Sequence, residues 1–154
     1  MNLDSKVLVR KLAMLERRLD NLAQPEKGWV PHFLTTPYTN TDFDGDSFSD
    51  VAANTKIENT DWSTTIPATA KALIIRILCR DSGSAATAGL YVALAGAAAA
   101  TGFPLVCRPS GKANNDFADS SGVVPCTDGD IWYQINASGA STMDVWLECY
   151  GWWE

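Results

Sequence analysis

The sequence predicts a mainly β protein, in which an N-terminal coiled-coil helix precedes an antiparallel β-sandwich or jelly-roll-like head. Two observations support this fold class. Leucines near the N-terminus recur with alternating spacings of four and three residues, which is the rhythm of a coiled coil. After Pro25, short alternating runs are separated by turn residues, without the helix–strand rhythm of α/β proteins. We therefore expect a stalk over residues 1–24, a neck over 25–41 and a head over 42–154.

The stalk segment carries a narrow leucine seam. The a and d positions of its heptads include Leu8, Leu12, Leu15, Leu19 and Leu22. A seam of this width buries little surface, and an isolated helix of about 20 residues is marginal in water. We therefore expect copies of the chain to wind together. The alternative is an amphipathic helix packed on its own head, but such helices usually show a wider apolar stripe.

The segment KLAMLE gives the seam a further signal. Lys11 stands at a g position and Glu16 at an e position, so in a parallel coil the two can meet between neighbouring helices. This pattern resembles the short trimerisation motif of parallel three-stranded coils, with Lys where Arg is usual. Leucine at both a and d leaves the oligomeric state open, and we favour a homotrimer. Leu3, Val7 and Met14 form a second, weaker stripe that would suit another partner.

Size and charge limit the function classes. The 154 residues allow one head domain beside the stalk. Charged residues make up 19% of the chain and the net charge is −6, which argues against nucleic acid and anionic membranes as partners. No stretch has the apolar length of a membrane span, so we expect no membrane insertion. The N-terminus has a heptad pattern rather than that of a signal peptide.

Alternating apolar residues predict the strands of the head. We expect strands at residues 71–80, 89–95, 105–107, 131–136 and 143–152. Small residues at 96–102 predict a hairpin loop, and the polar run 108–121 predicts a longer loop. Strands this short, with turns between them, favour a sandwich.

The last predicted strand has an unusual second face. Along it lie Asp144, Trp146, Glu148, Tyr150 and Trp152. Aromatic residues beside carboxylates suit an interface between subunits or a ligand platform better than the core of a monomer. We favour the interface, because the stalk would bring sister heads together. Its candidate residues are Trp146, Tyr150, Trp152 and Trp153.

Four cysteines, Cys79, Cys107, Cys126 and Cys149, occur without any CxxC pair, which argues against a zinc site. Cys79, Cys107 and Cys149 fall on the inward phase of predicted strands, so we expect buried free thiols. The alternative is a Cys107–Cys126 disulfide, which would need an oxidising environment.

Residues 42–50 (DFDGDSFSD) match the opening of an EF-hand-type calcium loop. The candidate ligands are Asp42, Asp44, Asp46 and Asp50. Ser47 stands where such loops have Gly, and Ala53 where a bidentate Glu completes the shell. The alternative is a turn before the first strand of the head. Calcium is therefore a candidate ligand, and no cofactor is required.

The sequence does not favour catalysis. His32 is the only histidine, and no Ser or Cys has a recognisable nucleophile context. Six Trp could stack on sugars, although core and interface packing is the simpler interpretation. We expect no enzyme.

Five pieces of the head carry a family resemblance. They are residues 44–49 (DGDSFS), 68–73 (ATAKAL), 80–84 (RDSGS), 128–134 (DGDIWYQ) and 143–148 (MDVWLE). With the stalk, they resemble trimeric fibre and decoration proteins of tailed bacteriophages. The resemblance implies a homotrimeric structural protein at the virion surface, either capsid decoration or tail fibre. Leu3, Val7 and Met14 would then dock onto other virion proteins. The alternative is a receptor-binding module for host attachment that recognises a host surface glycan or protein.

Overall fold

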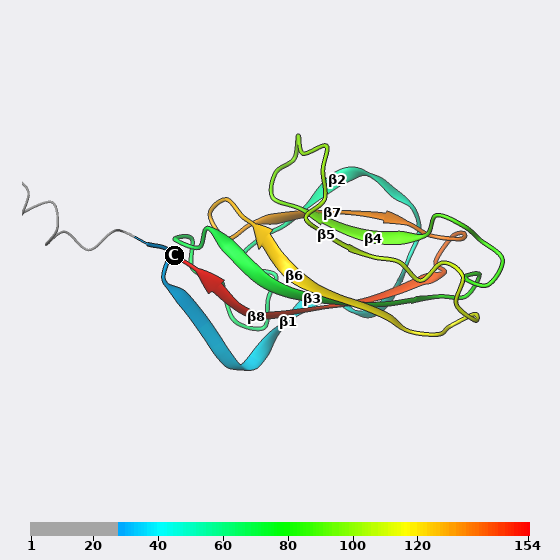
Figure 1. Cartoon of the computed structure of the whole chain (residues 1–154), viewed down its shortest axis with the longest axis horizontal. Helices are drawn as coiled ribbons and strands as arrows, with labels where there is room; N and C mark the ends of the chain where they lie inside the picture. The colour runs from blue at the N-terminus through cyan, green and yellow to red at the C-terminus, as the bar shows by residue number, and fades with distance from the viewer. Residues whose placement is uncertain (1–27) are drawn as a thin grey trace, which may run out of the picture.

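The computed structural model describes residues 28–154, which form a β-sandwich (Figure 1). The strands are β1 (Pro31–Phe48), β2 (Val51–Ile57), β3 (Ala72–Asp81), β4 (Tyr91–Ala95), β5 (Leu105–Cys107), β6 (Ala118–Pro125), β7 (Ile131–Asn136) and β8 (Met143–Trp153). They build two four-stranded antiparallel sheets with the orders β1-β8-β3-β6 and β2-β7-β4-β5. The predicted mainly β head is confirmed, whereas the predicted coiled coil lies outside the described residues.

The core lies between the two sheets. In β3, Leu73, Ile75 and Ile77 alternate with more exposed residues and are fully buried, as the sequence predicts. From the other sheet, Val92 and Leu94 are buried in the same core cluster. Each such side chain contributes about 1.5–3 kcal/mol relative to an exposed one. The sandwich is therefore held by the alternation of its central strands.

Three strands, β1, β2 and β6, lie outside the predicted strand ranges. β6 begins at Ala118, inside the predicted polar loop. The sequence predicts a loop there because the outward residues of this edge strand, Asp119 and Ser121, are polar. β1 begins at Pro31, so residues 31–41 of the predicted neck are strand and pair with β8. Register shifts interrupt β1 and hide its alternation.

An extra residue near the end of β8 reverses its faces. Ile75 pairs with Cys149 but Ile74 pairs with Gly151, which leaves Tyr150 without a partner in β3. Beyond this bulge, Trp152 lies on the core side of the sheet and packs against the core cluster. The expectation that Trp152 shares a face with Trp146 is therefore corrected.

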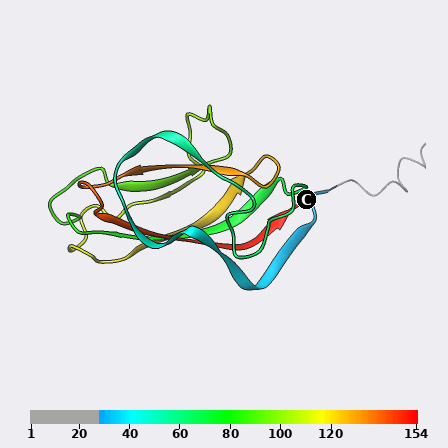
Figure 2. The same cartoon turned by 180° about the vertical axis from the view of Figure 1, so that it is seen from behind.

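Both ends of the described chain lie at one end of the sandwich (Figures 1 and 2). Val30 and Glu154 exchange backbone hydrogen bonds of 2.8 and 3.0 Å. The segment that follows the predicted stalk is thus tied to Glu154, the residue that follows β8. Within residues 28–154, no helix is long and apolar enough to cross a membrane.

Candidate functional site: the outer face of the β1-β8-β3-β6 sheet

The part of this face that lies farthest from residue 28 is a charged and aromatic cluster. Arg80 Nε donates to Asp144 Oδ2 over 2.8 Å, and Ser47 Oγ donates to Asp144 Oδ1 over 2.8 Å. The Arg80 guanidinium carbon lies 5.1 Å from the ring centroid of Phe117 and 5.6 Å from that of Trp146. These distances fit cation–π contacts. Trp146, a predicted platform residue, is therefore half-buried within its own head.

Gly45 explains the DGD segment that resembles a calcium loop. Its φ is +114°, and an added Cβ would lie 2.7 Å from Cζ2 of Trp146. The glycine therefore lets β1 pass directly over the tryptophan ring. This packing accounts for the Gly without any metal ion.

The four candidate calcium ligands do not form a cluster. Asp42, Asp44 and Asp46 lie in β1, while Asp50 follows it and accepts a hydrogen bond of 2.7 Å from the backbone N–H of Ala137. Within residues 28–154, no three His, Cys, Asp or Glu side chains are placed to hold a metal ion together.

The middle of the face is charged but internally paired. Arg76 lies 3.5 Å from Glu148 Oε2 and 3.5 Å from Asp119 Oδ2. The Tyr150 hydroxyl donates to Glu148 over 2.8 Å. Partly exposed ion pairs of this kind contribute about 0–1 kcal/mol. Tyr150, another predicted platform residue, thus serves to hold Glu148 in place.

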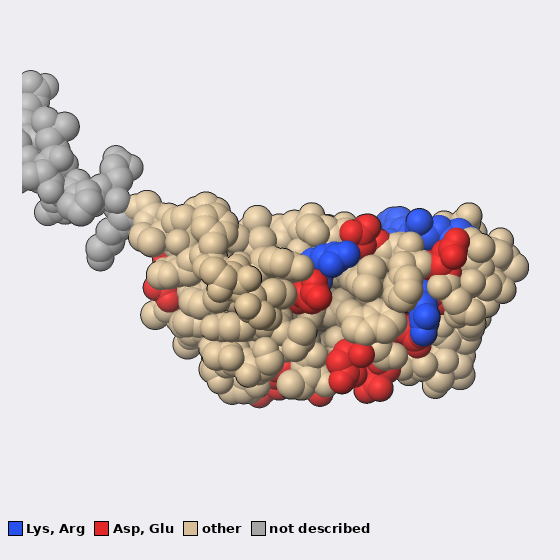
Figure 3. Space-filling view, turned by 90° about the horizontal axis from the view of Figure 1, so that it is seen from below, with Lys and Arg blue, Asp and Glu red and all other residues tan. Residues whose placement is uncertain are grey.

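The third part of the face is uncharged. Val123, Ile74, Gly151 and Phe33 are successive neighbours across β6, β3, β8 and β1, and Trp153 lies in the next row. Phe33 is 71% exposed and Val123 is 48% exposed. We name Phe33, Ile74, Val123 and Trp153 the apolar end. Figure 3 shows few charged residues at the end of this face where the described chain begins.

The apolar end adjoins the start of the described chain. Trp29 and Val30 are also exposed, and the hydrogen bonds between Val30 and Glu154 place them beside Trp153. Five large hydrophobic side chains are exposed among residues 28–154, and of these only Phe117 lies elsewhere on the head. Exposed apolar residues that gather in one place mark interaction surfaces.

His32 and Trp152 pair with each other across β1 and β8, on the core side of the sheet behind the apolar end. Their rings stack with centroids 5.4 Å apart and an interplanar angle of 14°. His32 Nε2 lies 3.2 Å from Glu154 Oε2, and Trp152 Nε1 donates to Glu154 Oε1 over 3.2 Å. The pKa of Glu154 is lowered, and the hydrogen bond from Thr69 is the largest cause. Burial acts to raise this pKa, whereas Trp152 and His32 lower it further. His32 thus has a structural contact.

A small cleft lies on the opposite sheet. It has a volume of about 150 Å³ and is lined by Tyr91, Ala93, Phe103, Val106 and Arg108. The Tyr91 and Phe103 rings are 6.5 Å apart, and the Arg108 guanidinium carbon lies 5.8 Å from the Tyr91 ring centroid. No local pattern in the sequence predicts this cleft, because its residues come together only through the hairpin of β4 and β5.

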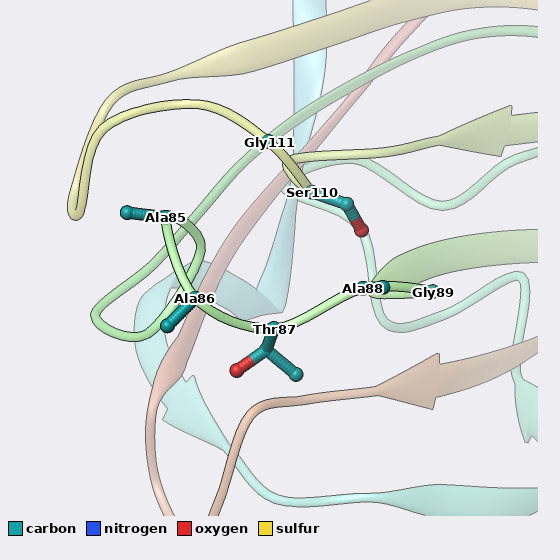
Figure 4. A pocket seen from close by; sticks show the side chains of 7 residues that line it. All are labelled: Ala85, Ala86, Thr87, Ala88, Gly89, Ser110 and Gly111. Carbon is teal, nitrogen blue, oxygen red and sulfur yellow. The ribbon is translucent and has the colours of Figure 1, made fainter.

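A second hollow of about 320 Å³ lies between two loops (Figure 4). Its lining residues are Ala85, Ala86, Thr87, Ala88, Gly89, Ser110 and Gly111. No charged side chain lines it, and the Ser110 hydroxyl donates to the carbonyl of Leu90 over 3.2 Å. The hollow offers little chemistry for recognition.

The structure confirms the expected buried thiols. Cys79, Cys107, Cys126 and Cys149 are all buried and free. The alternative Cys107–Cys126 bridge is not formed, because Cys107 contacts Cys79 instead.

The predicted stalk residues lie outside the described residues. These are the leucine seam, Lys11, Glu16 and the stripe of Leu3, Val7 and Met14. Comparison with protein-family models finds no matching family, and comparison with curated proteins finds no match.

Proposed function

We propose that this chain is a structural protein of a bacteriophage virion, displayed at the particle surface as a homotrimer. It would act as capsid decoration or as part of a tail fibre, without a catalytic step. One observation supports the proposed trimer. The apolar end adjoins residue 28, where the segment with the leucine seam joins the head. A parallel coil would hold three copies of this surface within reach of one another.

The apolar end alone is too small to hold heads together. A standard interface buries about 800 Å² per partner, whereas the exposed apolar side chains here are few. Tethering changes this balance, because linked copies meet at a high effective concentration. The coil and the apolar end would therefore act together: the coil sets the stoichiometry, and the apolar ends orient the heads.

The oligomeric state tests this division of roles. Placing aspartates in the seam, as Leu12→Asp with Leu15→Asp, buries charge at a and d positions and should convert a trimer into monomers. Arg17→Glu, at an f position off the seam, is the matched control and should leave the trimer intact. Light scattering after gel filtration measures both variants. A seam variant that stays trimeric would contradict the proposal.

Location on the particle is tested separately. Antibodies against the head should label intact virions at regular positions in electron micrographs, and the chain should appear in the mass spectrum of purified particles. Its presence only in infected cells, and never on particles, would overturn the virion role but not the trimer.

A receptor-binding role is the second candidate, and the cleft between Tyr91 and Phe103 favours it. Aromatic rings beside a guanidinium can stack on a sugar and pair with its acidic group. At about 150 Å³, the cleft is below the 300–1,000 Å³ of typical ligand pockets and has room for about one sugar ring. Binding of acidic glycans on an array, lost in both Tyr91→Ala and Arg108→Ala but kept in Arg76→Ala, would support this role. Silence of the natural chain would reject it.

A further inference from the structure

Two thiols are in contact across the sandwich. Cys79 lies in β3 and Cys107 in β5, which belong to different sheets. Cys79 Sγ donates a hydrogen bond of 3.4 Å to Cys107 Sγ, and both residues are buried. The other two thiols bond to backbone carbonyls, Cys126 to Ala70 and Cys149 to Gly151, each over 3.2 Å.

We propose that Cys79 and Cys107 are a disulfide-forming pair that joins the two sheets when the protein meets an oxidising environment. This inference concerns the head alone and does not rest on the proposed function. Bond formation must bring the sulfur atoms from 3.4 Å to about 2.05 Å. The two sulfur atoms are already in contact, whereas any other pairing requires breaking the present contacts of Cys126 or Cys149.

β5 provides the route for an oxidant. It is a three-residue edge strand that pairs only with β4, whereas Cys79 lies in β3 between β8 and β6. Local opening is easiest for short edge strands with few partners. Opening of β5 therefore exposes Cys107 first, and its return places Cys107 against Cys79 again.

The two thiols also differ in acidity. The hydrogen bond from Cys79 lowers the pKa of Cys107, and burial opposes this effect. The same hydrogen bond, together with burial, raises the pKa of Cys79. Burial raises the pKa of Cys126 and the pKa of Cys149 to about 11 each. Because the thiolate is the nucleophile, Cys107 is the thiol prepared to react first.

The reaction needs a low-molecular-weight disulfide such as oxidised glutathione. The Cys107 thiolate attacks one sulfur atom, which forms a mixed disulfide and releases one glutathione thiolate. Cys79 then loses its proton and attacks Cys107 Sγ, which releases the second glutathione. In total, two protein thiols are oxidised to one disulfide and one oxidised glutathione is reduced to two thiols.

Tryptic peptides identify the bridge in the full chain. Cys79 lies in peptide 77–80 and Cys107 in peptide 81–112, since Pro109 protects Arg108 from cleavage. Cys126 and Cys149 share peptide 113–154. After incubation with oxidised glutathione near the unfolding temperature and alkylation of the remaining thiols, we expect 77–80 linked to 81–112. A link from 81–112 to 113–154, or four alkylated cysteines, would overturn the inference.

Thermal stability gives a second measurement. The oxidised chain should unfold roughly 5–10 °C higher than the reduced chain, and a reductant should reverse the shift. Cys126→Ala should keep this shift, because Cys126 is outside the pair. Cys107→Ala should abolish it, and should do so even if this variant is less stable at the start. An equal shift in both variants would contradict the pairing.

Discussion

At the scale of single residues, Asp81 is the most informative buried group. Its carboxylate accepts hydrogen bonds from the Gly83 N–H at 2.7 Å, the Ser138 N–H at 3.0 Å and the Thr142 hydroxyl at 3.1 Å. These donors belong to the loop after β3 and the loop between β7 and β8. Burial acts to raise the pKa of Asp81, but the hydrogen bonds outweigh it and the pKa is lowered. Asp81 thus joins two loops at the far end of the sandwich.

Asp81→Asn should destabilise the head. The amide has one acceptor oxygen and turns an NH₂ group toward one of the donors, so we expect a loss of about 1–3 kcal/mol in the free energy of unfolding at pH 7. A carboxyl group whose pKa is lowered in the folded state stabilises the fold at pH values above its unfolded pKa of about 3.9. This stabilisation is lost as the pH falls from there through the folded pKa. Urea unfolding should therefore show the difference from the natural chain at pH 7, and a smaller one below about pH 4.

The matched control for this prediction is Asp119→Asn. Asp119 is exposed in edge strand β6, and its partner Arg76 keeps Glu148 as a second carboxylate. This variant should stay within about 0.5 kcal/mol of the natural chain. Equal losses in both variants would show that the hydrogen bonds of Asp81 carry no special stability.

At the scale of elements, the junction of β1 and β8 depends on Gly151. Its φ is +153°, and an added Cβ would overlap the backbone carbonyl oxygen of His32 in β1. The strands can approach here only because the residue has no side chain. The bulge at Tyr150 and this close approach together turn Trp152 into the core.

Gly151→Ala should therefore weaken the end of the sandwich that carries the apolar end. We expect a loss of at least about 2 kcal/mol, from the strained backbone and the displaced β1. Thermal unfolding followed by tryptophan fluorescence measures it. Gly102→Ala is the control, because no heavy atom lies within 4 Å of its added Cβ, and it should unfold close to the natural chain. Unchanged stability in Gly151→Ala would mean that β1 does not depend on this contact.

The success of sequence reasoning follows the locality of each signal. β3 and β8 are predicted well because alternation within one strand identifies a buried face. The sequence does not predict β6, because this edge strand exposes polar residues. The face predicted for Trp152 is wrong because a single extra residue in β8 reverses the period. Pairing between distant strands has no local signature.

The candidate sites show the same limit. Phe33 and Val123 are 90 residues apart in sequence and share a row only through β8 and β3. Likewise, Cys79 meets Cys107 rather than Cys126 because the two sheets are stacked. The sequence does predict aromatic residues at an interface on β8, but not that Trp146 is occupied within the head by Arg80 and Phe117.

At the scale of the whole molecule, the apolar end should contribute to assembly. Phe33→Ser with Val123→Ser removes apolar area from the proposed contact without touching the core. Losing about 1.5–3 kcal/mol per buried side chain would raise the trimer dissociation midpoint at least about tenfold. A dilution series followed by sedimentation velocity gives the midpoint. Phe117 is 48% exposed, like Val123, but is distant from residue 28. The control variant Phe117→Ser should therefore leave the dissociation midpoint nearly unchanged.

The mass of the full-length chain in solution tests the central claim most directly. Native mass spectrometry or sedimentation equilibrium at micromolar concentration should give about three times 16.6 kDa, because the leucine seam and the apolar end act together. A mass of 16.6 kDa over the whole concentration range would contradict the account, since the seam would then have no sister copy to cover it.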